Sequence, residues 1–492
     1  MPIRISRRDF LQASAFAAAG LVLSPRLLRA AAPIRVRGRV LSGSRGLAGV
    51  SVSDGLQVVG TGADGGFELI TDGARKYVTV SPPRGYDFPV QPAGTFRLFE
   101  RISPDARGEQ AVRFDLPRLA GDDTRHGVIV LGDTQTADRE EMARLHAETV
   151  PDVIETVKTL GGLPLFGIAD GDIMYDDLTL YPEYERAVTR MGIPFGQVIG
   201  NHDLDLKVDG DGASTATFER HFGPRYYSFN RGEFHYVVLD DVFYHGTGYL
   251  GYVDEDQLRW LAADLARVEK GSPVMVFLHI PLIPTQGPRH GRRPEISSSV
   301  TNRDALLRLL EPYQTMLISA HMHENDHMRH GEKIREWNIG TSCGAWWTGD
   351  ICYDGTPNGY GILDVNGPSL RWLYKATRQG PGYQLKVHPR GADPAAPDEI
   401  VANVWNWDPD WTVTYFVNGE RRGSMARRIG RDPDSVAQHT GPDLPKKRGW
   451  VEPQNTNHHF YAPVPADARE VIVEAKDPWG GVYTARPVAG GQ

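Results

Sequence analysis

The stretch Pro194-Phe195-Gly196-Gln197-Val198-Ile199-Gly200-Asn201-His202-Asp203 sets an Asn and a His directly after an apolar run. The run from Pro194 to Ile199 is typical of a buried strand, and a tight polar turn ends it. An Asn carbonyl oxygen can ligate a divalent cation, and a neighbouring His can donate a proton, so this pair can form half of a metal-assisted acid. Four residues alone are a weak signal, which gains weight only if other strands end in further ligands.

Four other junctions have the same form, because each predicted strand runs directly into donor side chains. The strands are Gly127 to Leu131, Pro164 to Ile168, Val274 to Leu278 and Met316 to Ser319, and the donors after them are Asp133 with Gln135, Asp172, His279, and His321 with His323. Helical patterns at about 139–160 and 254–268 lie between these strands, and such alternation predicts an α/β sheet whose loops gather at one edge. A lone Asp there is usually a helix cap, and a lone His a core or surface residue. Five junctions together predict a metal site, and oxygen and imidazole donors without thiolates suit Mn, Fe or Zn.

The segments on either side of this α/β region are patterned as short strands and turns. Residues 33–116 predict a small β-sandwich, 117–125 a linker, and 383–488 a second β domain with a hairpin turn at Asn418-Gly419. A further hairpin is expected between 226 and 240. The basic run Pro445 to Arg448 is interpreted as a solvated loop.

Composition excludes several classes of protein. A net charge of -8, from 54 basic and 62 acidic residues, disfavours a nucleic-acid or anionic-membrane binder. With only two cysteines, Cys343 and Cys352, the chain has no disulfide framework and no thiolate zinc cluster. The pair can form one bridge or remain as two buried thiols, and the sequence leaves both open.

Residues 1–32 are expected to be a targeting segment. A basic start with Arg7-Arg8 leads into the apolar stretch Ala13 to Leu23, which is too short to span a bilayer. The paired arginines followed by Phe10-Leu11 resemble a twin-arginine export signal, and this resemblance implies a periplasmic or exported protein. No transmembrane segment is expected after the signal is removed.

In order, the motifs Gly-Asp-x-Gln, Gly-Asp, Gly-Asn-His-Asp, His and x-His-x-His resemble those of the calcineurin-like metallophosphoesterase superfamily over residues 127–376. The resemblance implies a four-layer αββα sandwich with a two-metal centre of Mn, Fe or Zn. The flanks look like those of an exported bacterial subgroup with an N-terminal, prealbumin-like β-sandwich and a C-terminal β domain. The implied activity is hydrolysis of a phosphomonoester or phosphodiester through a metal-bridging hydroxide.

The resemblance also implies a role for each motif residue. Asp172 bridges both metals, Asp133, Gln135 and His323 complete one site, and Asn201, His279 and His321 complete the other. His202 stands beside the pair and protonates the leaving group, with Asp203 or Asp176 as its carboxylate partner. The implied substrate is a small-molecule, lipid or glycan phosphate, and the sequence does not choose among these.

Three features leave alternatives open. Gln135 stands where the family usually has His, which favours a weakened site and, as one alternative, an envelope- or carbohydrate-binding protein. Gly171-Asp172-Ile173-Met174-Tyr175 is similar to the motif in which purple acid phosphatases bind iron through Tyr, which would make Tyr175 a ligand. Cationic and aromatic loop residues are candidates for the substrate pocket: Tyr244, His245, Tyr249, His290, Arg292, Arg293, Trp346 and Trp347.

Overall fold

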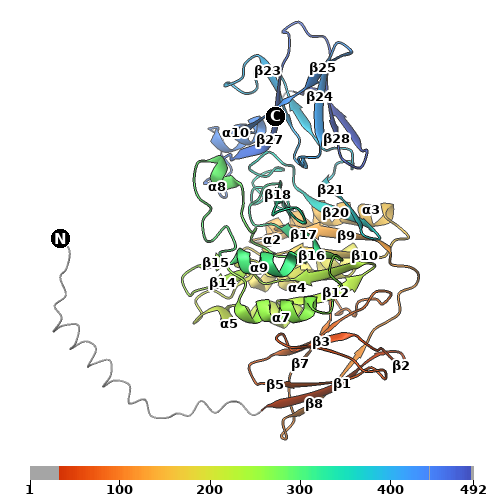
Figure 1. The fold of residues 1–492 in the computed structure, drawn as a ribbon. Helices are drawn as coiled ribbons and strands as arrows, with labels where there is room; N and C mark the ends of the chain where they lie inside the picture. The colour runs from red at the N-terminus through yellow and green to blue at the C-terminus, as the bar shows by residue number, and fades with distance from the viewer. Residues whose placement is uncertain (1–32, 443, 489–492) are drawn as a thin grey trace, which may run out of the picture.

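The computed structural model describes residues 33–442 and 444–488 of the 492-residue chain. Three parts are stacked end to end in Figure 1, with the N-terminal β domain at the bottom, an α/β domain in the middle and the C-terminal β domain at the top. The expected export signal at 1–32 lies outside the described residues. Among the described residues, no helix is long and apolar enough to cross a membrane.

The N-terminal domain consists of two four-stranded sheets. One sheet contains β1 (Ile34–Ser42), β2 (Arg45–Gly46), β5 (Gly66–Thr71) and β8 (Glu109–Asp115); the other contains β3 (Ser51–Ser53), β4 (Val58–Gly60), β6 (Tyr77–Ser81) and β7 (Phe99–Arg101). Alternating residues such as Val36, Val52 and Val80 form the core between the sheets. A loop of this domain carries Phe88 and Phe96, which pack against Phe166 and Phe229 of the next domain. This contact fixes the two domains together.

The middle domain contains two larger sheets, each with parallel strands at its centre. The first has the order β11-β10-β9-β20-β21, from strands β9 (Arg125–Leu131), β10 (Leu165–Asp170), β11 (Phe195–Val198), β20 (Gly359–Asn366) and β21 (Ser369–Ala376). The second has the order β12-β13-β16-β17-β19-β18, from β12 (Tyr227–Arg231), β13 (Phe234–Val238), β16 (Pro273–Phe277), β17 (Gln314–Ser319), β18 (Asp326–Arg329) and β19 (Ile334–Asn338). A short ribbon, β14 (Val242–Tyr244) with β15 (Tyr249–Gly251), lies beside them.

These two sheets pack face to face and helices cover their outer faces. Val130, Ile168, Tyr236 and Phe277 belong to the core between the sheets. The first sheet packs outward against α2 (Arg139–Arg144), α3 (Val150–Thr159) and α4 (Tyr181–Met191), and the second against α7 (Glu255–Leu265) and α9 (Arg303–Leu310). The short helices α5 (Asp211–Ser214), α6 (Ala216–Phe222) and α8 (Gln286–Arg289) lie in loops. The predicted four-layer αββα sandwich is confirmed.

The helical stretch predicted at about 139–160 is divided in the structure. A π-helical turn at Leu145–Thr149 separates α2 from α3, and Pro151 lies in the first turn of α3. Because Pro has no backbone N–H to donate, the regular helix is interrupted where α3 begins. Helices α4 and α9 were not predicted from the sequence, although both have an apolar face toward the core.

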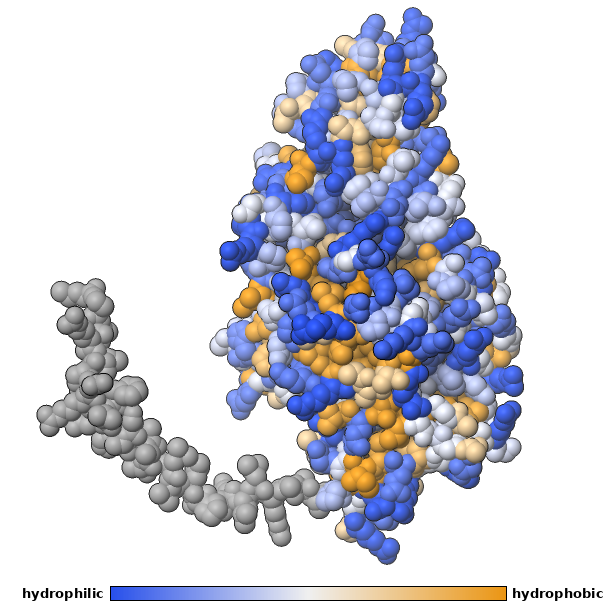
Figure 2. All heavy atoms as spheres, in the orientation of Figure 1, coloured by the Kyte–Doolittle hydropathy of each residue, from blue (hydrophilic) through white to orange (hydrophobic). Residues whose placement is uncertain are grey.

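The C-terminal domain again consists of two four-stranded sheets. One contains β22 (Lys386–His388), β23 (Glu399–Asn403), β26 (Ala426–Arg431) and β27 (Asn455–Pro463); the other contains β24 (Thr412–Val417), β25 (Glu420–Ser424), β28 (Val471–Lys476) and β29 (Val482–Ala485). The helix α10 (Pro433–Thr440) follows β26. On the face drawn in Figure 2, hydrophilic residues dominate this upper part, and hydrophobic residues gather lower on the molecule.

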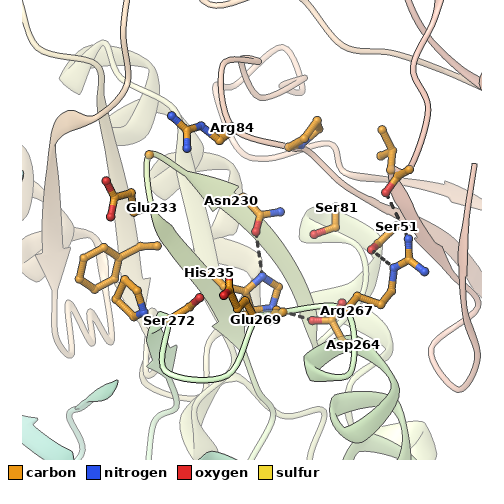
Figure 3. Close-up of a pocket in the computed structure, with 17 residues that line it drawn as sticks. Ser51, Ser81, Arg84, Asn230, Glu233, His235, Asp264, Arg267, Glu269 and Ser272 are labelled. Carbon is orange, nitrogen blue, oxygen red and sulfur yellow. Dashed lines mark hydrogen bonds and ion pairs between the residues drawn. The ribbon is translucent and has the colours of Figure 1, made fainter. Parts of the chain in front are cut away.

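A cavity of about 510 Å³ lies between the N-terminal domain and the β12–β13 hairpin (Figure 3). Arg267 Nε donates to Ser51 Oγ at 2.8 Å across this boundary, and His235 Nε2 lies 2.8 Å from Asp264 Oδ2 at the cavity wall. The cavity is separate from the five strand ends that carry the predicted ligands.

His126, at the start of β9, bonds Tyr236 of β13 and so links the two sheets of the middle domain. From its environment we predict that the stability of the fold is sensitive to acid. Its Nδ1–H donates to the carbonyl of Asp123 at 2.9 Å, so Nε2 accepts from the Tyr236 hydroxyl at 2.5 Å, as only a neutral ring can. Burial lowers the pKa of His126 from 6.5 to about 4. Between pH 6.5 and 4 the unfolded state binds more protons at His126 than the folded state does. The free energy of unfolding therefore decreases as the pH falls, and this group accounts for a loss of up to about 3 kcal/mol below pH 4.

We expect His126→Gln to flatten the pH dependence of urea unfolding between pH 6.5 and 4. The measurement is the unfolding midpoint, followed by Trp fluorescence at several pH values. The exposed loop residue His245 provides the control, since His245→Gln should leave the pH dependence unchanged. Equal slopes for wild type and His126→Gln would show that His126 is not the acid-sensitive group.

Candidate metal centre

The predicted ligands lie together because the strands before them are parallel. Strands β9, β10 and β11 are parallel neighbours in the first sheet, and β16 and β17 are parallel in the second. Their carboxyl ends therefore meet at one edge of the sandwich, where ligand sites of open α/β sheets form. The first sheet supplies Asp133, Gln135, Asp172 and Asn201, and the second supplies His279, His321 and His323.

The backbone at these strand ends is strained. Positive φ angles occur at Asp133 (35°), Gln135 (36°), Asp172 (45°), Asp176 (65°), His321 (66°), His323 (50°), Trp346 (54°) and Trp347 (59°). Residues other than Gly adopt this region at a cost, and such residues concentrate at functional sites.

One group of donors comprises Asp172, His279 and His321, with one ligand atom of each within 4.8 Å of the others. The ring of His279 is oriented by its Nδ1–H, which donates to the carbonyl of Asp170 at 3.0 Å. Its Nε2 faces Asp172 Oδ1 at 3.3 Å. Burial alone would lower the pKa of His279, but the charge of Asp172 raises it well above its usual value, so Nε2 carries a proton that a cation at this point would replace. Burial lowers the pKa of His321 to about 3, so this second ring is neutral.

A second group comprises Asp133 and His323. His323 Nδ1–H donates to the carbonyl of Gly344 at 2.7 Å, so Nε2 carries the lone pair, 3.6 Å from Asp133 Oδ1. Asp133 Oδ2 accepts from the backbone N–H of His321 at 3.1 Å, which ties this group to the first. Burial lowers the pKa of His323 to about 3, and burial raises that of Asp133 to about 8 although the charge of His279 opposes the shift.

Gln135 is placed beside Asp172, but not in the orientation expected of a ligand. Its Nε2 donates to Asp172 Oδ2 at 2.8 Å, and its Oε1 faces Cys343 Sγ at 3.9 Å. In this orientation Gln135 is a hydrogen-bond donor to Asp172, and rotation of the amide by half a turn would be needed to ligate through its oxygen. Cys343 and Cys352 are both buried free thiols.

The donor set fits divalent cations. Asp133 Oδ1, Asn201 Oδ1 and His279 Nε2 are buried and have no hydrogen-bond partner among the described residues. Each is a polar atom that can bind a cation once any proton on it is lost, and burying such atoms unsatisfied is costly. Oxygen and imidazole donors in a buried cluster match the preferences of Mn, Fe and Zn.

A third cluster in the C-terminal domain has a different explanation. His388, Asp432 and Asp434 lie close enough to hold a cation. However, Asp432 accepts from the backbone of Asp434 and Ser435 as the N-cap of α10, and from Asn403 and His388 at 2.9 and 3.0 Å. We assign this cluster to the hydrogen-bond network that anchors α10.

His202 lies beside the donor groups and is held on three sides. Its backbone N–H donates to Asp172 Oδ1 and its Nδ1 bonds Asp176 Oδ1, both at 2.8 Å. The ring of Tyr175 stacks on the imidazole with centroids 4.2 Å apart. Burial alone would lower the pKa of His202, but the charge of Asp172 and the bond to Asp176 raise it above its usual value.

The structure distinguishes the two carboxylates expected beside His202. Asp176 contacts the ring, whereas Asp203 is buried and accepts from the backbone N–H of Gly200, Ile173 and Met174 and from the Tyr181 hydroxyl, each at 3.0 to 3.1 Å. Asp203 therefore holds the loop of Asp172 against the loop of Asn201. The structure thus places Asp176, and not Asp203, in contact with the His202 ring, although both were expected as candidates for that partner.

Gly200 is needed for space, and Gly200→Ala is expected to impair the site. A Cβ at this position would lie 2.0 Å from the backbone N of Asp172 and 2.2 Å from its Oδ1. The substitution must displace Asp172, and we expect a loss of about 10- to 100-fold in metal affinity, as for other residues that orient ligands. Titration of the apo-protein with Mn²⁺ measures this. Gly212→Ala, where a Cβ would meet nothing within 4 Å, is the matched control, and equal affinities for the two variants would contradict the expectation.

Several supporting residues were not recognised in the sequence. Asp241, buried at the end of β13, accepts from the backbone N–H of His279 and Ile280, and Asp170 supplies the carbonyl that orients His279. The consecutive Asp240-Asp241 after an apolar run was a usable signal for the first. The interpretation of Pro445 to Arg448 as a solvated loop was wrong at its end, because Arg448 is largely buried against Glu141 of α2.

The loop residues expected to form the substrate pocket do not all lie near the predicted ligands. Two of them contact predicted ligands, since Trp346 stacks on His323 at 3.9 Å and the edge of Tyr249 faces His321 at 6.0 Å. Trp347 is buried, with Nε1 donating to the carbonyl of Thr134 at 3.1 Å. Tyr244 is also buried, whereas His245, Arg292 and Arg293 are exposed in loops.

Comparisons with known proteins find family matches in two regions of the chain. Sequence models for the N-terminal and the C-terminal regions of calcineurin-like phosphoesterases match residues 34–119 and 336–483. A comparison with curated proteins finds no match.

Similar solved structures include a dimetal phosphatase from Danio rerio, at 15% identity over 51% of this chain and 96% of that one, with a TM-score of 0.36. They also include a purple acid phosphatase from yellow lupin (Lupinus luteus), at 11% identity over 70% of this chain and 67% of that one, with a TM-score of 0.37. The two family matches lie before the first predicted ligand, Asp133, and after the last, His323. The two ends of the chain thus match the N-terminal and C-terminal regions of calcineurin-like phosphoesterases.

Proposed function

We propose that this protein is a metal-dependent phosphoesterase that hydrolyses a phosphomonoester or phosphodiester. The observation that carries the proposal is the convergence of buried polar atoms without hydrogen-bond partners on Asp133, Asn201 and His279, from the ends of strands in two sheets. A structural cluster would pair these atoms with donors, whereas a site for cations needs them unpaired.

Two cations of Mn, Fe or Zn would be held around Asp172. One would take Asn201, His279 and His321, and the other Asp133 and His323, with Gln135 beside it if its amide rotates. When bound, two such ions neutralise the charge of the phosphoryl oxygens and lower the pKa of a water.

The chain itself supplies the proton for the leaving group. With Nδ1 directed at Asp176, the other nitrogen of His202 is the one that can present a proton to the departing oxygen. Burial disfavours the imidazolium of His202, but the charge of Asp172 and the bond to Asp176 outweigh it and raise the pKa, which favours the protonated form. Tyr175 covers one face of the ring and excludes water from it.

The substrate is proposed only as a class. A small-molecule, lipid or glycan phosphate would suit an acidic exported enzyme, and we propose that residues 1–32 direct export by the twin-arginine route to the periplasm. A nucleic-acid substrate is not expected at a net charge of -8.

The test is hydrolysis of matched aryl phosphate monoesters and diesters by the purified protein. We expect turnover with added Mn²⁺, Fe²⁺ or Zn²⁺ and its loss with a chelator, and the faster ester identifies the substrate class. Absence of turnover with every metal, while two ions are bound per chain, would contradict the proposal and favour a binding role. A tyrosinate-to-iron absorption band in the active protein would instead favour the iron phosphatase with Tyr175 as ligand.

A further inference from the structure

Two aromatic rings cover imidazoles of the site. Tyr175 lies flat on His202, with centroids 4.2 Å apart and 19° between the planes, and Trp346 lies flat on His323 at 3.9 Å and 22°. Both Tyr175 and Trp346 belong to the middle domain and are half-buried. One face of each ring lies on an imidazole of the site. The residues that contact the opposite face therefore help to keep each ring in place.

A short segment of the C-terminal domain, Arg448 to Trp450, contacts both rings. The guanidinium of Arg448 lies over the ring of Tyr175, 4.9 Å from its centroid, and Trp450 packs on Trp346 at 4.8 Å. Arg448 also donates to the backbone carbonyl of Trp346. One segment of the C-terminal domain therefore contacts both Tyr175, which stacks on the proposed acid, and Trp346, which stacks on a predicted ligand.

Arg448 is held in place by a nearly buried ion pair. Its Nη1 and Nη2 donate to the two carboxylate oxygens of Glu141 at 2.6 and 3.1 Å. The side chain of Arg448 is 10% exposed and that of Glu141 is 4% exposed. Such a two-pronged bond fixes the plane of the guanidinium, and together with the bond to Trp346 it uses three of the five N–H groups of Arg448.

The stacking of Arg448 on Tyr175, and of Tyr175 on His202, restrains the His202 ring in the direction perpendicular to its plane. Asp176 holds His202 by one ring nitrogen at its edge, which leaves the ring able to swing about that bond. The flat face of Tyr175 prevents this motion, and the cation on the far side of Tyr175 keeps that ring pressed inward.

We propose that Arg448 is a positioning residue by which the C-terminal domain, acting through Tyr175, keeps His202 aligned with the leaving group. This inference rests on the proposed role of His202 as general acid. It gives the C-terminal domain a part in the reaction without any contact with the substrate.

The test compares an aryl and an alkyl ester of whichever class the wild type hydrolyses. An aryl leaving group departs without a proton, whereas an alkoxide needs one, so misalignment of the acid affects mainly the alkyl ester. For Arg448→Ala we expect kcat on the alkyl ester to fall about tenfold or more and kcat on the aryl ester to change less than about threefold. KM should stay within about twofold for both, since Arg448 does not touch the substrate.

Two further variants separate positioning from structure. Lys447→Ala is the matched control, because Lys447 also pairs with α2, through Asp138 and Glu140, but is half exposed. It should behave as wild type. The double variant R448M/E141Q removes the cation without leaving the buried Glu141 charge unpaired, and it should show the same selective loss as Arg448→Ala.

The outcomes are distinguishable. Equal losses on both esters, or wild-type kinetics in R448M/E141Q, would overturn the inference and leave Arg448 as a counter-charge for Glu141. Wild-type protein without metal-dependent turnover would instead overturn the proposed function itself.

Discussion

Asp172→Asn is expected to abolish turnover and to remove bound metal. The Asp172 carboxylate is buried between the two donor groups, with His279 Nε2 at 3.3 Å from Oδ1 and Gln135 Nε2 at 2.8 Å from Oδ2. An amide cannot supply the negative charge that two cations share. Because metal assistance contributes several kcal/mol and each 1.4 kcal/mol changes the rate about tenfold, kcat should fall at least about a thousandfold.

The substitution is chosen to keep the fold intact. Asn tolerates the left-handed backbone at this position, where φ is 45°, better than other residues do. Metal per chain, measured by inductively coupled plasma mass spectrometry, and kcat are the two readouts. The exposed neighbour Asp177, which caps a short helical turn, is the control, since Asp177→Asn should keep both metal and activity. Two metals and full turnover in Asp172→Asn would refute the assignment of Asp172.

His202→Ala is expected to separate chemistry from metal binding. The ring bonds Asp176 and stacks on Tyr175, while the contact of this residue with Asp172 is made by its backbone N–H, which Ala retains. General acid catalysis by a positioned side chain contributes about 10²- to 10⁴-fold, so kcat should fall by that amount on an alkyl ester. Metal content should remain at the wild-type level.

Asp176→Asn provides a graded comparison for this prediction. An Asn at 176 can still accept from Nδ1 but no longer stabilises the imidazolium by charge, so its loss of kcat should be smaller than that of His202→Ala. Loss of bound metal in His202→Ala would instead identify His202 as a ligand, and unchanged kcat would exclude it as the acid.

The positions of the donors were predictable because strand ends are determined by local patterns. The apolar runs predicted to end at Leu131, Ile199 and Leu278 form strands that end within one residue of those positions. These strands have parallel neighbours, and parallel strands bring the residues after them to one edge. The four-layer arrangement followed from the alternation of strands with helices together with the family resemblance. Boundaries were less predictable, as the π-helical turn at Leu145–Thr149 shows.

The orientation of side chains was not predictable from the sequence. Asp203 follows His202 directly in the chain and Asp176 lies 26 positions before it, yet the tertiary structure directs Asp203 to three backbone N–H groups and Asp176 to the imidazole. The amide of Gln135 likewise bonds Asp172 through a contact 37 positions apart in sequence.

Long-range contacts explain why the basic run that ends at Arg448 was wrongly interpreted as a solvated loop. The basic residues 446–448 have the composition of a solvated loop, and nothing local to them indicates that Glu141, 307 positions away, is their partner. Only the docking of the C-terminal domain beside α2 makes Arg448 a neighbour of Tyr175.

The most direct test of the two-cation site is anomalous X-ray diffraction from crystals of the protein grown with Mn²⁺. We predict two anomalous peaks, one on each side of the Asp172 carboxylate, with Asn201, His279 and His321 around one and Asp133 and His323 around the other. A map with no peak at Asp172, or with manganese bound only elsewhere in the chain, would contradict this account.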